Sequence, residues 1–232
     1  METTCWHPWR VDRAEALELQ QKLAGKVCRT GDADSVRYIA GVDISAGRFQ
    51  ETAAAAVVVM SYPELKPVET RIISRKLNFP YIPGLLSFRE APLILAACAR
   101  LEIVPDLMMV DGQGIAHPRR LGLASHLGLL LNVSTIGCAK SRLCGRHEAA
   151  GIESGSYAEL VEGDEVIGAV LRTRHGVKPL YVSIGHRIDL GHAIRMVMDC
   201  CRGYRLPEPT RLAHLAAGGN LNISAGLEPA RR

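Results

Sequence analysis

The sequence predicts an α/β fold with a central β-sheet flanked by helices. Two apolar runs, residues 53–60 and 107–110, contain no charged side chain and are typical of strands buried on both faces. Other segments, such as residues 11–23 and 190–202, carry apolar residues at helical spacing. The chain of 232 residues could form one large domain or two small ones. Because no linker interrupts it, we expect a single domain over residues 1–217.

The first part of the chain is expected to form a helix followed by three strands. The helix covers residues 11–23, and the strands cover residues 38–43, 53–60 and 67–77. Because the connections between these strands are short, we expect an antiparallel meander. The first of the three strands runs directly into Asp43.

Two helices and a strand are expected next, over residues 87–101, 121–131 and 134–139. Ser87 and Glu90 have the Ser-x-x-Glu spacing of a capping box. Glu90 would then either close the start of its helix or present a carboxylate beside the strand ends.

The last part of the chain is less regular. We expect, in order, an irregular region rich in Gly and Ser over residues 141–163, a hairpin over 166–173 and 179–184, an amphipathic helix over 190–202, and a final helix capped by residues 207–210. From residue 218 to residue 232 the sequence has no clear period, so we expect a disordered C-terminal tail.

Composition argues against several classes of protein. No apolar run reaches the ~18 residues that a membrane span needs, and the first residues lack the features of a secretion signal, so no membrane is expected as a partner. The seven cysteines never form a Cys-x-x-Cys pair, which argues against a zinc ribbon or a disulfide framework and favours the cytoplasm. The positive charge excess lies in residues 112–232 and suits a phosphate-bearing polymer, although scattered surface charge would look similar. Nothing indicates an obligate dimer, so we expect a monomer.

Asp111 ends the apolar run 107–110 and is followed by Gly112 and Gly114. An ionised Asp at the mouth of a buried strand needs a cation or hydrogen bonds to compensate it. The glycines let the backbone turn sharply and let a ligand approach it closely. Asp111 is therefore a candidate metal ligand, although Asp-Gly more commonly just starts a turn.

Charged side chains recur at the ends of the expected strands. Asp43 and Asp111 each follow an apolar strand, and Lys140 follows a third. If these strands are neighbours, the three side chains converge, and Glu90 and His214 are candidates to join them. Carboxylates suit Mg²⁺, which tolerates few protein ligands together with water and substrate phosphate. A lysine can offset phosphate charge and a histidine can relay a proton, so the pattern favours a metal-dependent phosphoryl hydrolase.

Residues 79–84, Phe-Pro-Tyr-Ile-Pro-Gly, form a loop that two prolines and a glycine make rigid. The loop holds Tyr81 on a stiff support. Tyr81 would either close the core as a buried tyrosine or act as a wedge that enters a nucleic-acid duplex.

Five blocks resemble the endonuclease V family, the deoxyinosine 3′ endonucleases, and the resemblance extends over roughly residues 10–217. The blocks are Ala-Gly-Val-Asp at 40–43, Phe-Pro-Tyr-Ile-Pro-Gly-Leu-Leu-Ser-Phe-Arg-Glu at 79–90, Val-Asp-Gly-Gln-Gly-Ile-Ala-His-Pro-Arg at 110–119, Gly-Cys-Ala-Lys-Ser-Arg-Leu at 137–143 and Thr-Arg-Leu-Ala-His-Leu at 210–215. The probability that all five blocks agree in this order by chance is very small.

The resemblance implies a ribonuclease H-like fold, a mixed central sheet flanked by helices. It implies Mg²⁺-dependent cleavage of DNA beside a deaminated base, chiefly hypoxanthine, with Mn²⁺ able to replace Mg²⁺. The cut would fall at the second phosphodiester bond 3′ to the lesion and leave 3′-hydroxyl and 5′-phosphate ends. A ribonuclease acting on inosine-containing RNA and a catalytically silent nucleic-acid-binding module are the alternatives.

The resemblance also implies roles for individual residues. Asp43 and Asp111 match direct metal ligands, Glu90 a ligand acting directly or through water, Lys140 the water-orienting cation and His214 the rim histidine. The strand-separating wedge matches Pro80, Tyr81, Ile82 and Pro83, and the pocket for the flipped base matches Gly84, Leu86, Gly112, Gly114 and His117. Backbone N–H groups of the glycine-rich turn could then donate to the hypoxanthine carbonyl, which adenine lacks.

Two departures from the family pattern affect local packing, namely Ile44-Ser45-Ala46-Gly47 after the first Asp and Cys138 in place of an aliphatic residue. The nucleic-acid backbone would be held by basic residues, for any one of which a solvated surface position is equally plausible. These residues are Arg89, Arg119, Arg120, Arg142 and Arg187. The histidines without a matching role are His126, His147, His175, His186 and His192.

Overall fold

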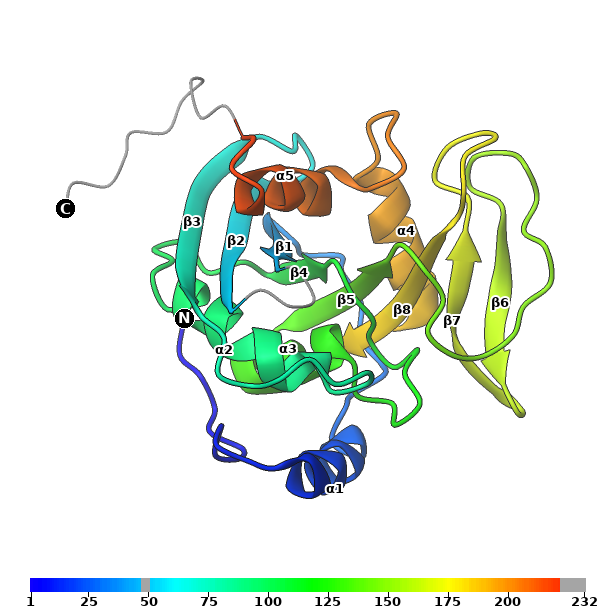
Figure 1. Cartoon of the computed structure of the whole chain (residues 1–232). Helices are drawn as coiled ribbons and strands as arrows, with labels where there is room; N and C mark the ends of the chain where they lie inside the picture. The colour runs from blue at the N-terminus through cyan, green and yellow to red at the C-terminus, as the bar shows by residue number, and fades with distance from the viewer. Residues whose placement is uncertain (47–50, 222–232) are drawn as a thin grey trace.

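The computed structural model describes residues 1–46 and 51–221, and within them an eight-stranded sheet forms the centre (Figure 1). The strand order is β3-β2-β1-β4-β5-β8-β7-β6. The strands are β1 (Tyr38–Ser45), β2 (Thr52–Ser61), β3 (Pro67–Lys76), β4 (Leu107–Val110), β5 (Ser134–Ala139), β6 (Tyr157–Glu162), β7 (Glu165–Leu171) and β8 (Leu180–His186). The helices are α1 (Arg13–Ala24), α2 (Leu86–Cys98), α3 (Leu123–Leu131), α4 (Leu190–Asp199) and α5 (Glu208–Ala217). The predicted α/β class with a mixed central sheet is confirmed.

Three parallel strands at the centre of the sheet determine where the site lies. β1 pairs in parallel with β4, and β4 pairs in parallel with β5, with Val42 opposite Val110 and Val110 opposite Gly137. The carboxyl ends of these three strands therefore meet at one edge of the sheet. On one side β1, β2 and β3 form the predicted antiparallel meander, and on the other β7 and β8 form the predicted hairpin.

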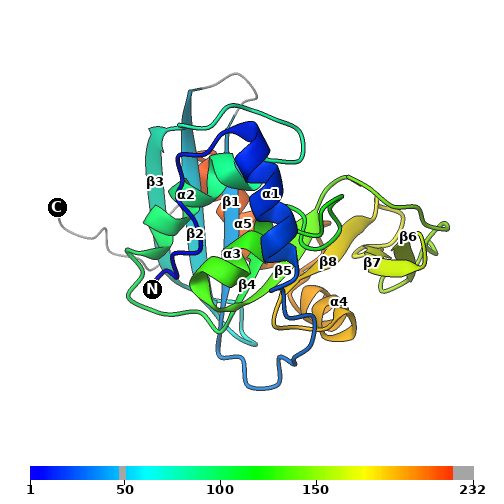
Figure 2. The same ribbon diagram turned by 90° about the horizontal axis from the view of Figure 1, so that it is seen from below.

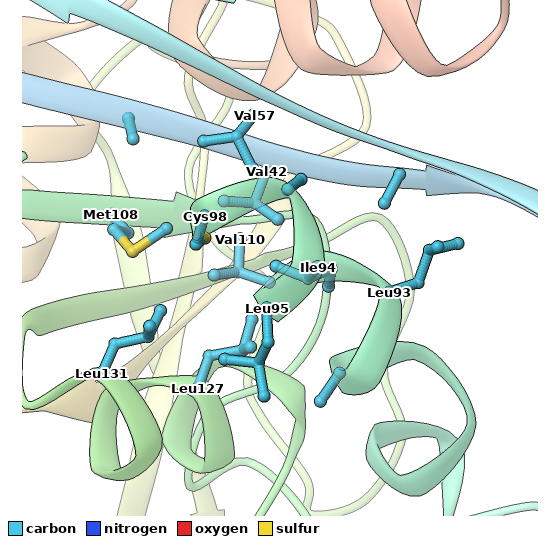
Figure 3. Packing of buried hydrophobic residues seen from close by; sticks show 14 of the residues in the cluster. Val42, Val57, Leu93, Ile94, Leu95, Cys98, Met108, Val110, Leu127 and Leu131 are labelled. Carbon is cyan, nitrogen blue, oxygen red and sulfur yellow. The ribbon is translucent and has the colours of Figure 1, made fainter. Parts of the chain in front are cut away.

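Helices cover both faces of the sheet. α2 and α3 lie on one face with α1 outside them, whereas α4 and α5 lie on the other (Figures 1 and 2). On the first face Val42 and Val110 belong to one buried apolar cluster with Ile94 of α2 and Leu127 of α3 (Figure 3). This packing fixes α2 against the strands that end at the candidate site. No helix in the described part of the chain is long and apolar enough to cross a membrane.

α5 packs against β1 at a glycine. A Cβ atom built on Gly41 would lie 1.8 Å from the carbonyl oxygen of Pro209, in the first turn of α5. Only a residue without a side chain allows this approach. The contact brings the start of α5 onto the strand that carries Asp43.

The start of α2 differs from the prediction. The helix begins at Leu86, its N-cap is Leu85, and no side chain caps it. Ser87 lies inside the first turn, is buried, and has a hydroxyl without a hydrogen-bond partner among the described residues. The Ser87–Glu90 capping box is therefore wrong, because the chain enters the helix one residue before the serine.

The region predicted to be irregular, residues 141–163, ends in the edge strand β6. Only Leu160 of this strand is fully buried, so the sequence shows little of the alternation that marks a strand. The predicted disorder of residues 218–232 mostly concerns residues 222–232, which lie outside the described residues, as does Gly47 of the departure after Asp43.

Candidate active site

Two carboxylates and a histidine meet at the carboxyl edge of the sheet. Asp43 and Asp111 follow the paired residues Val42 and Val110 on neighbouring parallel strands. Potential ligand atoms of Asp43, Asp111 and His214 all lie within 4.8 Å of one another. The Nδ1 atom of His214 donates a hydrogen bond to Oδ2 of Asp43 over 2.6 Å. Three elements thus bring residues that are distant in the sequence to one point.

Lys140 completes the row of strand-end charges. Its Nζ atom forms an ion pair with Oδ2 of Asp111. The ammonium side chain is 38% exposed, whereas the Asp111 side chain is only 11% exposed. The lysine therefore partly neutralises a nearly buried carboxylate while remaining accessible from solvent.

Glu90, on α2, interacts electrostatically with Asp43 and Asp111. Burial, with the negative charge of Asp43 as the next cause, raises the pKa of Glu90 to about 8 against the opposing effect of Arg89. The pKa of Asp43 is also raised, first by burial and then by the charge of Asp111. Burial is the first cause of both shifts and the neighbouring carboxylate the second, so the ionised forms of both groups are disfavoured in the structure without a cation.

The residues present fit a divalent cation. The donors are carboxylate oxygens, which hard ions such as Mg²⁺ prefer, and they converge although they repel one another. Within residues 1–46 and 51–221, the side chains of these two aspartates have Lys140, His214 and the backbone N–H of Ile44 as polar partners. A cation between the aspartates would supply the missing positive charge.

A cavity of about 150 Å³ lies beside the cluster. Gly112, the residue after Asp111, contributes to its wall. Of the other residues proposed for a base pocket or wedge, the lining contains Tyr81, Ile82, Pro83, Gly84, Leu86 and His117. Pro80 and Gly114 do not line it.

Gly114 serves packing instead. Its N–H donates to Oγ of Ser183 over 2.9 Å, and a Cβ atom at this position would lie 2.0 Å from the carbonyl oxygen of Ile184 on β8. This N–H is consequently occupied and does not serve the expected role of a donor to a bound base. The glycine is required because β8 passes against the turn.

Three donors converge on the carbonyl oxygen of Gly84, at the end of the rigid loop. They are Nε2 of Gln20 at 2.9 Å, Nε2 of His117 at 3.0 Å and Nη2 of Arg119 at 2.8 Å. Gln20 also accepts a 2.5 Å hydrogen bond from Nε of Arg119. Gly84 itself has a φ of +79°, a conformation that favours glycine. This clamp ties α1 and the loop to the cavity wall.

The protonation of His117 follows from its two hydrogen bonds. Nε2–H donates to the Gly84 carbonyl, so Nδ1 is the acceptor of the Arg119 backbone N–H at 3.1 Å. Burial, reinforced by the charge of Arg119, lowers the pKa of His117 to about 4. His117 is therefore a neutral structural donor near neutral pH.

Sequence reasoning missed several residues of this cavity, including Gln20, Gln113 and Leu143. Gln20 is buried at 1% exposure on a helix to which the sequence assigned no chemistry. The signal that could have identified it is its position: a glutamine among the inward-facing residues Ala16 and Leu23.

Most arginines proposed to hold a nucleic-acid backbone have partners within the chain. Arg89 donates to the Phe79 carbonyl, Arg120 pairs with Glu162 and Glu165, and Arg187 donates to Asn132. Arg119 belongs to the clamp on Gly84. Their main roles in this structure are thus to fix loops.

Comparisons with known proteins agree over nearly the whole chain. Residues 21–215 match the family model described as Endonuclease V. The endonuclease V of Dehalococcoides mccartyi is 54% identical over 211 residues, which cover 91% of this chain and 95% of that protein.

Solved structures give the same result. The crystal structure of the endonuclease V from Streptomyces avermitilis is 40% identical with a TM-score of 0.86, covering 94% of this chain and 96% of that one. The endonuclease V of Ciona intestinalis, solved in complex with a 24mer DNA containing an inosine followed by a ribo-adenosine, is 30% identical with a TM-score of 0.76. That match covers 89% of this chain and 96% of the Ciona chain.

Proposed function

The chain belongs to the endonuclease V family of nucleases, and from this we propose that it is a DNA-repair endonuclease for deaminated bases, chiefly deoxyinosine. It hydrolyses the second phosphodiester bond 3′ to the lesion and leaves 3′-hydroxyl and 5′-phosphate ends. The reaction depends on Mg²⁺, which Mn²⁺ can replace. The observation that carries the proposal is the convergence of Asp43, Asp111 and His214, beside a cavity of a size suited to a base.

In this proposal Asp43 and Asp111 bind the metal directly, and Glu90 binds it directly or through water. A cation held by these residues would supply charge stabilisation at the phosphate and would lower the pKa of a bound water molecule. Lys140, which is paired with Asp111 and partly exposed, offsets the charge of the scissile phosphate. His214 donates through Nδ1 to Asp43, and its largely exposed ring can exchange protons with solvent.

Recognition and cutting are assigned to neighbouring parts of one surface. The flipped base enters the cavity lined by Gly84, Gly112 and His117, while Tyr81 on the rigid loop fills the space that it leaves. Because Gly112 adjoins Asp111, the cavity and the metal site share one turn. The cavity and the carboxylates are nevertheless distinct places, which agrees with a cut displaced from the lesion. We propose that the protein acts in the cytoplasm, where free cysteines stay reduced, and that it acts as a monomer.

The test is an oligonucleotide with one inosine, prepared as DNA and as RNA, and incubated with Mg²⁺ or with EDTA. The proposal expects cutting of the DNA with Mg²⁺ and none with EDTA. Preferential cutting of the RNA would instead establish the ribonuclease alternative. Binding without cutting of either would establish the silent module, against which the repulsion between Asp43 and Glu90 already argues.

Asp111→Asn tests the role of the carboxylates, and Asp164→Asn is its matched control. Asp164 is an exposed residue between β6 and β7, so its variant should cut at the wild-type rate. Asp111→Asn should lose at least about 100-fold in rate because an amide is a poor ligand for a hard cation. Equal rates for the two variants would exclude the proposed metal site.

A further inference from the structure

A second cavity, of about 450 Å³, also adjoins the rigid loop and shares no lining residue with the first. Its lining contains Phe79, the first residue of the loop, and the two residues before it, Leu77 and Asn78. Tyr81, Ile82 and Pro83, later in the loop, line the first cavity. The same division continues into α2, where Leu86 and Ser87 face the first cavity and Phe88 and Arg89 the second. We call the second cavity the basic groove.

The charged side chains that line the basic groove are all positive. Its lining contains Arg10, Arg75, Lys76 and Arg89, and it contains no Asp or Glu. Arg10 and Arg75 are exposed, and neither has a side-chain partner in residues 1–46 and 51–221. Lys76 pairs with Glu51 over 2.9 Å, but both side chains are more than two-thirds exposed, so water and salt screen this pair. The groove therefore presents unneutralised positive charge.

A buried arginine connects the groove to the rigid loop. Nη1 of Arg89 donates to the carbonyl oxygen of Phe79 over 2.8 Å, and Arg89 is 9% exposed. The next residue in the helix, Glu90, belongs to the carboxylate cluster. Neighbouring residues of α2 thus contribute to the carboxylate site and to the basic groove, whose lining contains no Asp or Glu.

We propose that the basic groove binds the sugar–phosphate backbone of the uncut strand of duplex DNA. This inference rests on the proposed function, in which the strand with the lesion passes the base cavity and the carboxylates. If the loop separates the two strands, the complementary strand must leave on the opposite side of the loop. The basic groove meets the start of the loop, away from the residues that line the first cavity, and its exposed arginines complement a polyanion.

The test compares duplex and single-stranded DNA with the double variant Arg10→Ala/Arg75→Ala. Both side chains are exposed, so the variant should fold normally. Arg174→Ala, which removes one exposed charge between β7 and β8, is the control for a general loss of positive charge. Affinities for a labelled inosine oligonucleotide are measured by fluorescence anisotropy at several salt concentrations, with Ca²⁺ replacing Mg²⁺ to suppress cutting.

The double variant should bind the duplex roughly 10- to 100-fold more weakly at about 0.1 M salt. The slope of log Kd against log salt should fall by about 2, one for each lost phosphate contact. Its affinity for the single strand, and its rate of cutting that strand with Mg²⁺, should stay within about twofold of wild type.

Equal weakening for duplex and single strand would overturn the inference, because the groove would then hold the cut strand. An unchanged duplex affinity would overturn it as well. Failure of the proposed function would look different, since the wild-type protein itself would then not cut the single-stranded inosine substrate.

Discussion

Gly41→Ala should disturb the candidate active site by pushing α5, which carries His214, away from β1. The added Cβ would lie 1.8 Å from the Pro209 carbonyl oxygen, whereas ordinary contacts begin at 3.4 Å. The start of α5 would therefore have to move by about 1.6 Å, the difference between these distances, if β1 stays in place. Overpacking of this kind lowers the free energy of unfolding by about 1–3 kcal/mol.

The displacement should act on catalysis through His214. This residue lies on α5, and its Nδ1 atom is 2.6 Å from Oδ2 of Asp43, two residues after Gly41. A shift of about 1.6 Å would break that hydrogen bond, because such bonds weaken steeply beyond ~3.2 Å. A misplacement of about 1 Å in a catalytic constellation can lower a rate by ~100-fold, which is the loss expected for Gly41→Ala.

The assay combines urea unfolding with the rate of inosine-DNA cutting. Gly25→Ala is the matched control, since a Cβ at this helix end has 3.9 Å to its nearest neighbour and should leave both quantities unchanged. If the effect passes through α5, adding His214→Ala to Gly41→Ala should lower the rate little further. Wild-type cutting by Gly41→Ala, or fully additive losses in the double variant, would refute the reasoning.

Three further predictions concern buried polar groups. At pH 9, above the Glu90 pKa of about 8, Glu90→Gln should raise the midpoint of thermal unfolding without metal, because it removes a charge that burial and Asp43 disfavour. The same variant should reduce the stabilisation by added Mg²⁺, and a lower metal-free midpoint at that pH would contradict this. Burial, with the charge of His7 as a smaller cause, lowers the pKa of His126 to about 3, so the folded protein binds fewer protons than the unfolded chain between about pH 6.5 and 3. The contribution of this histidine to the free energy of unfolding should be fully present above about pH 7 and decrease as the pH falls, by up to about 5 kcal/mol. Urea titrations of His126→Phe should show a shallower decrease with falling pH. Gln20→Leu should lower the free energy of unfolding by about 2–4 kcal/mol, because it removes two hydrogen-bond donors and one acceptor from buried partners. The variant should also raise KM more than it lowers kcat. A selective loss of kcat would argue against a positioning role for Gln20.

The sequence was sufficient to predict the edge of the sheet where the charges meet. Asp43, Asp111 and Lys140 each follow an apolar run, and the apolar runs were recognisable because buried strands exclude polar side chains. Their convergence needed only that the strands be parallel neighbours, which the observed pairing satisfies. The roles of these residues in catalysis stay predictions.

The clamp on Gly84 could not be predicted in the same way. Its donors come from α1 and from the turn after β4, and a hydrogen bond between Gln20 and Gly84 spans 64 positions in the sequence. No periodicity encodes a contact of this kind. The capping box at Ser87 failed for a related reason, because a short local pattern does not reveal that the serine itself will be buried under tertiary contacts.

The packing of the core explains how a cluster of like charges can exist before a cation binds. Asp43 and Asp111 each follow a valine, Val42 or Val110, that is fully buried between the sheet and α2 (Figure 3). These valines hold the backbones of the two aspartates side by side, because moving them out of a close-packed cluster would cost several kcal/mol. Apolar burial therefore maintains the repulsion, and a cation that relieves it must bind the folded state selectively. At 100 times its Kd such a cation would add about 2.7 kcal/mol to the free energy of unfolding.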